Sequence, residues 1–539
     1  MPARSSSLLF SSIGFVLVTV FVASPLIDYR HLTDASYEGD SRLVIWTLAW
    51  DSHAILTGAP LFDANMFHPA GEALAWAEHH VGIALFALPV YALTGNPVLA
   101  YWVIWLVAFP LNGLAMQALA YRVTRDRVAA FGAGLVYAFC FFRMHHAHGH
   151  LQMLWTWALP LIPLAIARWV EHPSLVRAAV VAALVVLQAL SSWYLAVFAA
   201  LLSLSALLFL LSRRRVAPAH VVSGSIALAA SAWLLAWFAT PYLRVRAGGS
   251  VEAAGNAADL ASYLVPPQNT WLGQLLIEHS AMTPRWIWGE QTLYVGMTAL
   301  ALAVSGGWAW RKNADRLSAS VLAAGAVAFF LSLGPWNGWS VYDLFAQLPA
   351  MSLVRAPARF AVVVMVALAL LVSVAVADFR IRLRRVAPWA LAALAVLGLS
   401  ESYVINFPGG KPARMAIPDL YRDLRTLAPG AIVSLPSYAD SPEAFREADY
   451  LLFSTAHWYP TLNGFGRQNP PGHGPTMQTV SRFPDPDAVQ RLCDLQVRYV
   501  VLHADRAERL KEAAARAESE PGISLVRHDG NAWLFRVCG

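Results

Sequence analysis

The sequence predicts a mainly α-helical fold: a bundle of about 11 membrane-spanning helices followed by a small extracytoplasmic α/β domain. Of the 539 residues, 58% are hydrophobic and only 13% are charged, whereas soluble domains carry about 25% charged residues. The apolar residues form blocks of about 17 to 25 residues, long enough to cross a hydrocarbon layer about 30 Å thick. Two long polar stretches, 28–80 and 405–539, interrupt this pattern. These observations exclude a soluble fold.

The basic residues predict the topology. The net charge is +6, but only three of the 39 basic residues are lysines, and many of the arginines fall in short segments between apolar blocks. Such clusters mark cytoplasmic turns, so the positive charge indicates topology and no nucleic-acid partner. The clusters are Arg122, Arg125 and Arg127; Arg213, Arg214 and Arg215; Arg311, Lys312 and Arg316; and Arg380, Arg382, Arg384 and Arg385.

The predicted spans assign a side of the membrane to each loop. They lie near 8–27, 97–121, 128–142, 151–170, 178–192, 195–212, 219–239, 292–310, 317–334, 359–378 and 386–404. This places a multi-pass protein in the inner (plasma) membrane, with a cytoplasmic N-terminus. The predicted transmembrane domain is 1–404, with external loops 28–96, 143–150, 240–291 and 335–358. The shorter apolar segment 81–94 is expected to form an interfacial helix.

The C-terminal region differs from the rest of the chain. Residues 405–539 alternate helix-like with strand-like segments, which predicts an extracytoplasmic α/β domain. It has no glycine-rich phosphate loop, so a docking or capping role is favoured over a second enzyme. Cys493 and Cys538 both fall in this domain, where an oxidising environment would allow a disulfide. The sequence alone leaves open whether these two cysteines are bridged or free.

Titratable side chains concentrate in the first two external loops. Such groups are costly to desolvate beside a membrane, and their density favours a functional site over a simple solvated loop. Nine of the sixteen histidines are there: His31, His53, His68, His79, His80, His145, His146, His148 and His150.

The first loop contains two carboxylates separated by one glycine, Glu38 and Asp40. This arrangement suits a divalent cation, or a pair in which one carboxylate acts as a base and the other tunes it. The alternative is that Asp40 is the N-cap of the helix that follows.

The second loop combines Arg143 with His146 and His150, a set able to bind a phosphate. Its spacing does not match an H-E-x-x-H zinc site, so a metal ligand set is unknown from the sequence. Ordinary hydrogen bonds at helix ends are the alternative. Arg355 and Arg359, at the outer end of a predicted span, are further phosphate-binding candidates because guanidinium binds phosphate bidentately, with snorkelling as the alternative.

A third group of residues suits recognition of a sugar, because aromatic rings mixed with amide and carboxylate groups can stack against sugar rings and hydrogen-bond to hydroxyls. The loop 240–291 combines such residues, and an aromatic belt at the membrane interface is the alternative. The candidate substrate-binding residues are His79, His80, Asp259, Tyr263 and Glu290.

Together these features resemble the C-type (GT-C) glycosyltransferases, polytopic enzymes that use polyprenyl-phosphate sugars, and especially the branch of aminoarabinose and protein O-mannosyl transferases. The resemblance covers residues 1–404 and rests on the E-x-D motif in a long first loop, the polar second loop, the R-x-P-x-R-F segment and the external C-terminal domain. It implies that Asp40 is the catalytic carboxylate, with Glu38 beside it. The second loop departs from several branches because it contains no carboxylate.

The function predicted is transfer of a sugar from a polyprenyl-phosphate donor to a lipid, glycan or protein acceptor on the outer face of the membrane. No cofactor is certain, and a divalent metal stays an open alternative. A transporter or lipid flippase, or a non-catalytic subunit in cell-envelope polysaccharide assembly, are the competing functions. Transporters tend to carry ionisable residues in mid-span, whereas the charges of this chain fall in its loops.

Overall fold

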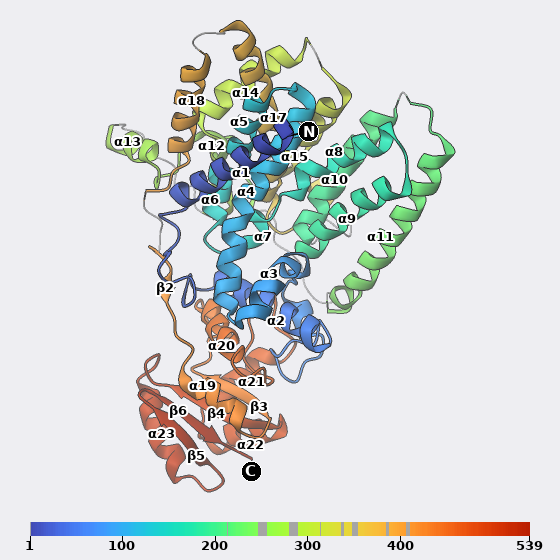
Figure 1. The fold of residues 1–539 in the computed structure, drawn as a ribbon. Helices are drawn as coiled ribbons and strands as arrows, with labels where there is room; N and C mark the ends of the chain where they lie inside the picture. The colour runs from blue at the N-terminus through green and yellow to red at the C-terminus, as the bar shows by residue number, and fades with distance from the viewer. Residues whose placement is uncertain are drawn as a thin grey trace. The chain divides into compact units, whose positions relative to one another are not determined.

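The computed structural model describes residues 2–212, 214–245, 256–279, 289–312, 314–335, 339–347, 354–383, 387–405 and 410–538 (Figure 1). The chain divides into two compact units. The first comprises Met1–Asp28, Val103–Phe238 and Gly249–Lys411, and the second comprises Tyr29–Trp102, Ala239–Gly248 and Pro412–Gly539. The boundary expected at residue 404 stays a prediction, while in this division the segment predicted to be the first external loop clusters with the C-terminal region.

The first unit is helical. Its described helices are α1 (Pro2–Val22), α5 (Arg127–Phe139), α6 (Phe141–His146), α7 (Leu151–Leu154), α8 (Ala158–Glu171), α9 (Leu175–Ser191), α10 (Trp193–Leu211), α12 (Leu260–Leu264), α13 (Trp271–His279), α14 (Met297–Trp310), α15 (Arg316–Ser332), α16 (Val341–Ala346), α17 (Ala361–Arg382) and α18 (Ala387–Glu401), with 3-10 turns η3 (Gly289–Gln291) and η5 (Pro357–Phe360). Helices α4 (Pro97–Thr124) and α11 (Pro218–Val245) contribute to both units.

Helix α17 forms the centre of the first unit and packs against α5, α14 and α15 (Figure 1). Small residues allow the close approach, as is common between membrane helices. A Cβ atom at Gly306 of α14 would lie 2.0 Å from the carbonyl oxygen of Leu371, and one at Gly325 of α15 would lie 2.4 Å from the Cβ of Ala367. Both neighbours are on α17, so larger side chains at these glycines would push the helices apart.

Within the described residues, length and composition identify five helical segments that could cross a membrane: Pro97–Thr124, Arg127–His146, Trp193–Leu211, Pro218–Val245 and Pro357–Arg382. Six shorter apolar helices accompany them, among them α3 (Val81–Thr94), the segment expected to be interfacial. The chain is therefore an integral membrane protein, while the number of eleven spans stays a prediction. The members of the four predicted basic clusters flank apolar helices wherever the structure describes them. Arg213, Arg384 and Arg385 lie outside the described residues.

The second predicted loop differs from expectation because its first half is helical. Cys140 adopts an extended conformation between α5 and α6, which breaks the helix, and α6 then continues to His146. The span expected at 151–170 is also divided, into α7 and α8. Breaks of this kind leave backbone carbonyls without helical partners, and side chains replace those partners here, as described below.

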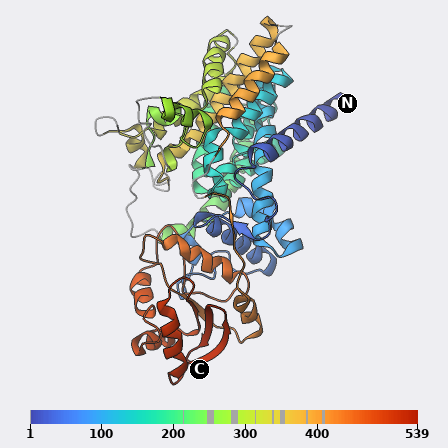
Figure 2. The ribbon, with the colours of Figure 1, turned by 90° about the vertical axis from the view of Figure 1, so that its left-hand side faces the viewer.

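The second unit contains the first external loop and the C-terminal region (Figure 2). Its elements are β1 (Ala35–Ser36), α2 (Asp40–Thr57), η1 (Ala73–Trp76), α3, β2 (Ala413–Arg414), α19 (Asp419–Asp423), η6 (Leu424–Thr426), β3 (Ala431–Leu435), η7 (Ala444–Arg446), α20 (Glu447–Ser454), α21 (His473–Val480), α22 (Pro486–Asp494), β4 (Val497–His503), α23 (Arg509–Ser519), β5 (Ser524–Asp529) and β6 (Ala532–Arg536).

A four-stranded mixed sheet organises the C-terminal part of this unit, with strand order β3-β4-β6-β5. Strand β3 pairs in parallel with β4, whereas β4, β6 and β5 pair antiparallel. Strand β4 is buried at all but one of its positions, as expected of a central strand with both faces covered. One hydrophobic cluster joins the first external loop to this region, since Trp46 and Trp50 of α2 pack with Leu451 of α20.

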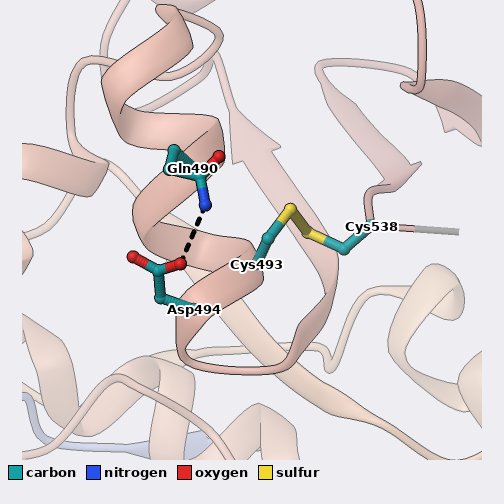
Figure 3. Close-up of a disulfide and its surroundings, with 4 residues drawn as sticks. All are labelled: Gln490, Cys493, Asp494 and Cys538. Atoms are coloured by element: carbon teal, nitrogen blue, oxygen red, sulfur yellow. Dashed lines mark hydrogen bonds between the residues drawn. A yellow bond between two sulfur atoms is a disulfide. The ribbon is translucent and has the colours of Figure 1, made fainter.

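A disulfide joins Cys493 at the end of α22 to Cys538 after β6 (Figure 3). The bridged state is thus the one that the structure contains. The remaining cysteine, Cys140, is free and buried. The disulfide ties the last residues of the chain to the helix that precedes the central strand.

We expect the native protein to resist thiol labelling until it is reduced. Maleimide-polyethylene glycol added to the unreduced, denatured protein should modify only Cys140, giving one added mass, and reduction should raise this to three. A Cys493→Ala variant should expose Cys538 and give two additions without reductant. Three additions to the unreduced wild type would contradict the disulfide.

Three buried histidines make the second unit sensitive to acid. Burial lowers the pKa of His457 and His503 to about 3 and that of His473 to about 4. Their neutral form therefore contributes stability above pH 6.5, the ordinary value, and this contribution is lost as the pH falls. The His503 ring stacks with Tyr421 and Tyr450, and its Nε2 lies 2.8 Å from the Tyr421 hydroxyl.

Acidification should consequently destabilise the second unit. Well below pH 6.5, each buried histidine should remove about 1.4 kcal/mol of unfolding free energy per pH unit. A His503→Phe variant retains a ring in the stack, and its unfolding free energy should fall less steeply between pH 6.5 and pH 5. Urea unfolding of the detergent-solubilised protein, followed by near-UV circular dichroism, measures both slopes. Equal slopes in the variant and wild type would refute this role of His503.

Candidate active site

The first unit brings four predicted site residues together: His146, His150, Glu290 and Arg359. His146 ends α6 and His150 precedes α7, so their rings meet across one turn with Nδ1 atoms 3.2 Å apart. His146 Nε2 lies 3.9 Å from Glu290 Oε2. Arg359 donates from Nε to the same carboxylate oxygen over 2.9 Å, and from Nη2 to the other oxygen. Residues distant in sequence therefore form one polar cluster.

The charges of this cluster are fixed by the bidentate pair of Glu290 with Arg359. Burial alone would raise the pKa of Glu290, but the Arg359 guanidinium outweighs burial and holds that pKa well below its usual range. Glu290 is thus an anion at neutral pH. Arg359 is buried and lies over the ring of Tyr194, with 4.6 Å from its Cζ to the ring centroid. The neighbouring Arg355 is exposed, and its backbone N–H donates to the Tyr194 hydroxyl.

His146, His150 and Glu290 form a group of potential metal ligands, with one ligand atom from each lying within 4.8 Å of the others. Two imidazoles and a carboxylate are a typical ligand set for Zn²⁺. Ligands around zinc at bond lengths of about 2.0–2.1 Å stand closer together than this, so the three side chains would have to approach one another, and Glu290 would be shared between the ion and Arg359. The sequence did not indicate this group, because Glu290 is far from the histidines along the chain.

Arg143 lies elsewhere in the first unit and has a structural environment. Its side chain is fully buried. Nε donates to the carbonyl of Tyr137 over 2.6 Å, and Nη1 donates to Thr156 Oγ1 and to the carbonyl of Met153. The guanidinium thereby replaces partners lost where the helix breaks. We therefore leave Arg143 out of the phosphate-binding set proposed below.

Asp259 and Tyr263 also make structural contacts in the first unit. Asp259 caps α12 in a reciprocal arrangement with Ser262. The Tyr263 hydroxyl lies 2.7 Å from Ser332 Oγ, and the ring is buried. These contacts account for both side chains without a ligand.

The E-x-D motif belongs to the second unit. Helix α2 begins at Asp40, and Gly39 is its N-cap residue. Asp40 therefore lies in the first turn of the helix. The alternative interpretation, in which Asp40 is the N-cap residue, is wrong. Both Glu38 and Asp40 are exposed, whereas Gly39 between them is buried. The two carboxylates are accordingly presented to solvent from a loop whose backbone is fixed.

His79 and His80 are held by Asp51, a residue that the sequence did not single out as part of the site. Asp51 is fully buried on α2, and its Oδ1 lies 2.6 Å from His79 Nδ1. Its Oδ2 accepts the backbone N–H of His80 over 3.1 Å. The backbone N–H of His79 donates to the Tyr242 hydroxyl. A carboxylate on Nδ1 fixes the orientation of an imidazole and leaves the Nε2 atom to act as the acceptor.

The apolar helices indicate an integral membrane protein, and matches to solved structures show that its fold is that of the C-type glycosyltransferases. The resemblance predicted from the motifs is confirmed at the level of fold. No family model and no curated protein matches the sequence.

Three solved structures illustrate this likeness. The arabinofuranosyltransferase AftD from Mycobacteria is 15% identical with a TM-score of 0.55, and the match covers 99% of this chain but 40% of AftD. ArnT from Cupriavidus metallidurans, bound to undecaprenyl phosphate, is 14% identical with a TM-score of 0.52, and 97% of each chain is covered. The oligosaccharyltransferase AglB from Archaeoglobus fulgidus, in complex with an inhibitory peptide and a dolichol-phosphate, is 12% identical with a TM-score of 0.51, covering 96% of this chain and 72% of AglB.

We expect the cluster of the first unit to bind Zn²⁺. Protein stripped with EDTA should take up about one equivalent in a calorimetric titration, and His150→Ala should weaken this uptake by about tenfold or more because one ligand is lost. His148→Ala is the matched control, since it removes a histidine of the same turn that is outside the ligand group. Absence of uptake by the wild type, or equal affinity in His150→Ala, would argue against a metal site.

Proposed function

We propose that the protein is a glycosyltransferase that moves a sugar from a polyprenyl-phosphate donor to an acceptor hydroxyl on the outer face of the membrane. The observation that carries the proposal is the GT-C fold combined with an exposed Asp40 in the first turn of α2. Two similar structures contain a polyprenyl or dolichol phosphate, which supports a donor of this chemical class. The acceptor is a lipid, glycan or protein.

Asp40 would act as the general base. Its carboxylate takes the proton from the acceptor hydroxyl as the oxygen attacks the anomeric carbon of the sugar, and the bond to the carrier phosphate breaks with inversion. Positioned proton transfer of this kind accelerates reactions by about 10²- to 10⁴-fold. Glu38, exposed beside it, would raise the negative potential near the base and favour proton uptake.

The leaving polyprenyl phosphate develops negative charge that cationic groups would neutralise, usually a large contribution to catalysis. The exposed Arg355 suits this role, because its guanidinium is accessible and guanidinium binds phosphate bidentately. Arg359 would add positive charge, and the imidazoles of His146 and His150 would add N–H donors. Alternatively, a divalent cation held by His146, His150 and Glu290 would supply the charge neutralisation, with the imidazoles acting as its ligands.

The sugar would be bound by polar groups with fixed orientation. His79, held by Asp51, and the adjacent His80 suit this role in the second unit. In the first unit, Glu290 is a separate candidate for accepting hydrogen bonds from sugar hydroxyls, because its carboxylate stays charged. The sugar could be a hexose or a pentose, because these groups recognise hydroxyls in general.

We propose an inner-membrane location with a cytoplasmic N-terminus and an external C-terminal domain. Two independent observations support this orientation. Basic residues cluster between apolar segments, which favours the cytoplasmic side for those turns, and the disulfide lies in the C-terminal region, where an oxidising compartment would maintain it.

Transfer from labelled polyprenyl-phosphate sugars in proteoliposomes tests the function. We expect the wild type to transfer from at least one donor and Asp40→Asn to lose about 10²- to 10⁴-fold in kcat. Asp494→Asn is the control, because it makes the same chemical change at an exposed aspartate of the second unit, one that accepts a hydrogen bond from Gln490 Nε2 over 2.8 Å (Figure 3).

The possible results separate the competing functions. Wild-type activity in Asp40→Asn, at equal expression, would overturn the assignment of the base. Failure of the wild type with every donor, together with movement of labelled lipid across the bilayer, would favour a flippase. Failure in both assays would favour a non-catalytic subunit.

A further inference from the structure

The loop that carries Asp40 is bounded on its N-terminal side by residues of the C-terminal region. Strand β1 pairs antiparallel with β2, with Ala35 opposite Arg414. The backbone N–H of Met415 donates to the carbonyl of Asp34 over 2.7 Å, and the Arg414 guanidinium pairs with the Asp34 carboxylate at 2.8 Å. Residues 34–36 are therefore fixed by chain that follows the last apolar helix.

The glycine of the E-x-D motif also lies against this region. Gly39 has a φ of 64°, and a Cβ atom there would lie 3.2 Å from the Cβ of Phe445 in η7. Positive φ and a close neighbour both favour glycine. The backbone between the two exposed carboxylates is thus packed on the C-terminal region.

A buried charge triad fixes the other side of the loop. Asp449 of α20 pairs with Arg42 through Oδ1 and with Arg506 through Oδ2, the latter at 2.8 Å. Both Arg42 and Asp449 are nearly fully buried. Arg42 Nε also donates to Ser36 Oγ over 3.3 Å. A single arginine therefore connects strand β1, the first turn of α2 and the C-terminal region.

These contacts surround residues 37–41, the segment that presents Asp40. A general base loses efficiency when its carboxylate is misaligned by small distances. Resting on the proposed function, we propose that Asp449 is a positioning residue: through Arg42 it holds the first turn of α2, and with it the Asp40 carboxylate, in the reactive orientation. The C-terminal region would then be an integral part of the catalytic unit, and not the separate docking or capping domain expected from the sequence.

A double-mutant cycle tests this role. Asp449→Asn should lower kcat by about tenfold or more and leave the donor KM within about twofold, because orientation of the base acts in the chemical step. In the Asp40→Asn background, the same substitution should have little further effect, since no base remains to be oriented. A merely structural residue would reduce both backgrounds by the same factor, and that outcome would overturn the proposal.

Two further variants guard against general unfolding. Phe445→Ala removes the ring packed on Gly39 without disturbing a buried charge, and it should show the same dependence on Asp40. Asp485→Asn, which breaks the exposed pair with Arg516 in the same unit, should leave kcat unchanged in both backgrounds.

Hydrogen exchange separates this proposal from the proposed function. The amides of residues 37–43 should exchange faster in Asp449→Asn than in the wild type, whereas those of α3 should not change. Unchanged exchange in residues 37–43 would refute the positioning role even in an active enzyme. Faster exchange in a protein that transfers no sugar would support the positioning of the loop by Asp449 but contradict the proposed glycosyltransferase function.

Discussion

The polar loops of this membrane protein depend on one constraint: each backbone carbonyl that leaves a helix near the hydrocarbon layer must find another donor. Where α5 ends, the Arg143 guanidinium donates to the carbonyl of Tyr137. Where α7 ends, Asn112 donates to the carbonyl of Leu154 over 2.6 Å. These replacements permit the chain to turn twice within a short distance, and the turn is what presents His146 as part of a polar cluster. The buried arginine is thus required for the cluster without belonging to it.

In the second unit, the corresponding constraint is electrostatic. Asp449 shares its two carboxylate oxygens between two arginines, so the buried triad carries one net positive charge. Removing one partner of a buried ion pair commonly costs about 3–5 kcal/mol, although an apolar replacement of the whole set can be neutral. Such a group is therefore weak evidence for net stability, and we infer that its contribution here is to orient the first turn of α2. Trp46 and Trp50 of α2 also pack against Leu451 of α20, and this apolar contact does not depend on precise orientation.

Patterns within short segments predicted the class of fold and several members of the site. Apolar blocks and basic turns indicated a helical membrane protein, and loop chemistry indicated Glu290 and Arg359, which the structure pairs. What the sequence could not provide was the partner of each charged group. Arg143 looked like a phosphate ligand because its donors are the same whether they meet a phosphate or a carbonyl. Asp51 was missed because a carboxylate within an amphipathic helix normally faces water.

The domain boundary was hidden for a related reason. Charge and periodicity describe a segment by itself, so residues 405–539 read as an independent α/β domain. The contacts of β1 with β2, and of α2 with α20, join segments almost 400 residues apart, and no local pattern encodes them. Long-range pairing is decided by packing and by buried charges, which become visible only when both partners are in place.

The discontinuous composition of the second unit has a consequence for biogenesis. Residues 29–102 emerge from the ribosome about 300 residues before the segment from 412 onward that completes their core, a delay of roughly 15–60 s at ordinary rates of synthesis. Throughout that interval the tryptophans of α2 lack the partner that the C-terminal region supplies, Leu451, and the early segment must be kept from aggregating while the remaining helices are inserted. Chain termination or cleavage before residue 412 would leave this surface permanently open, so quality control by a chaperone or protease has a simple feature to recognise in the unfinished protein.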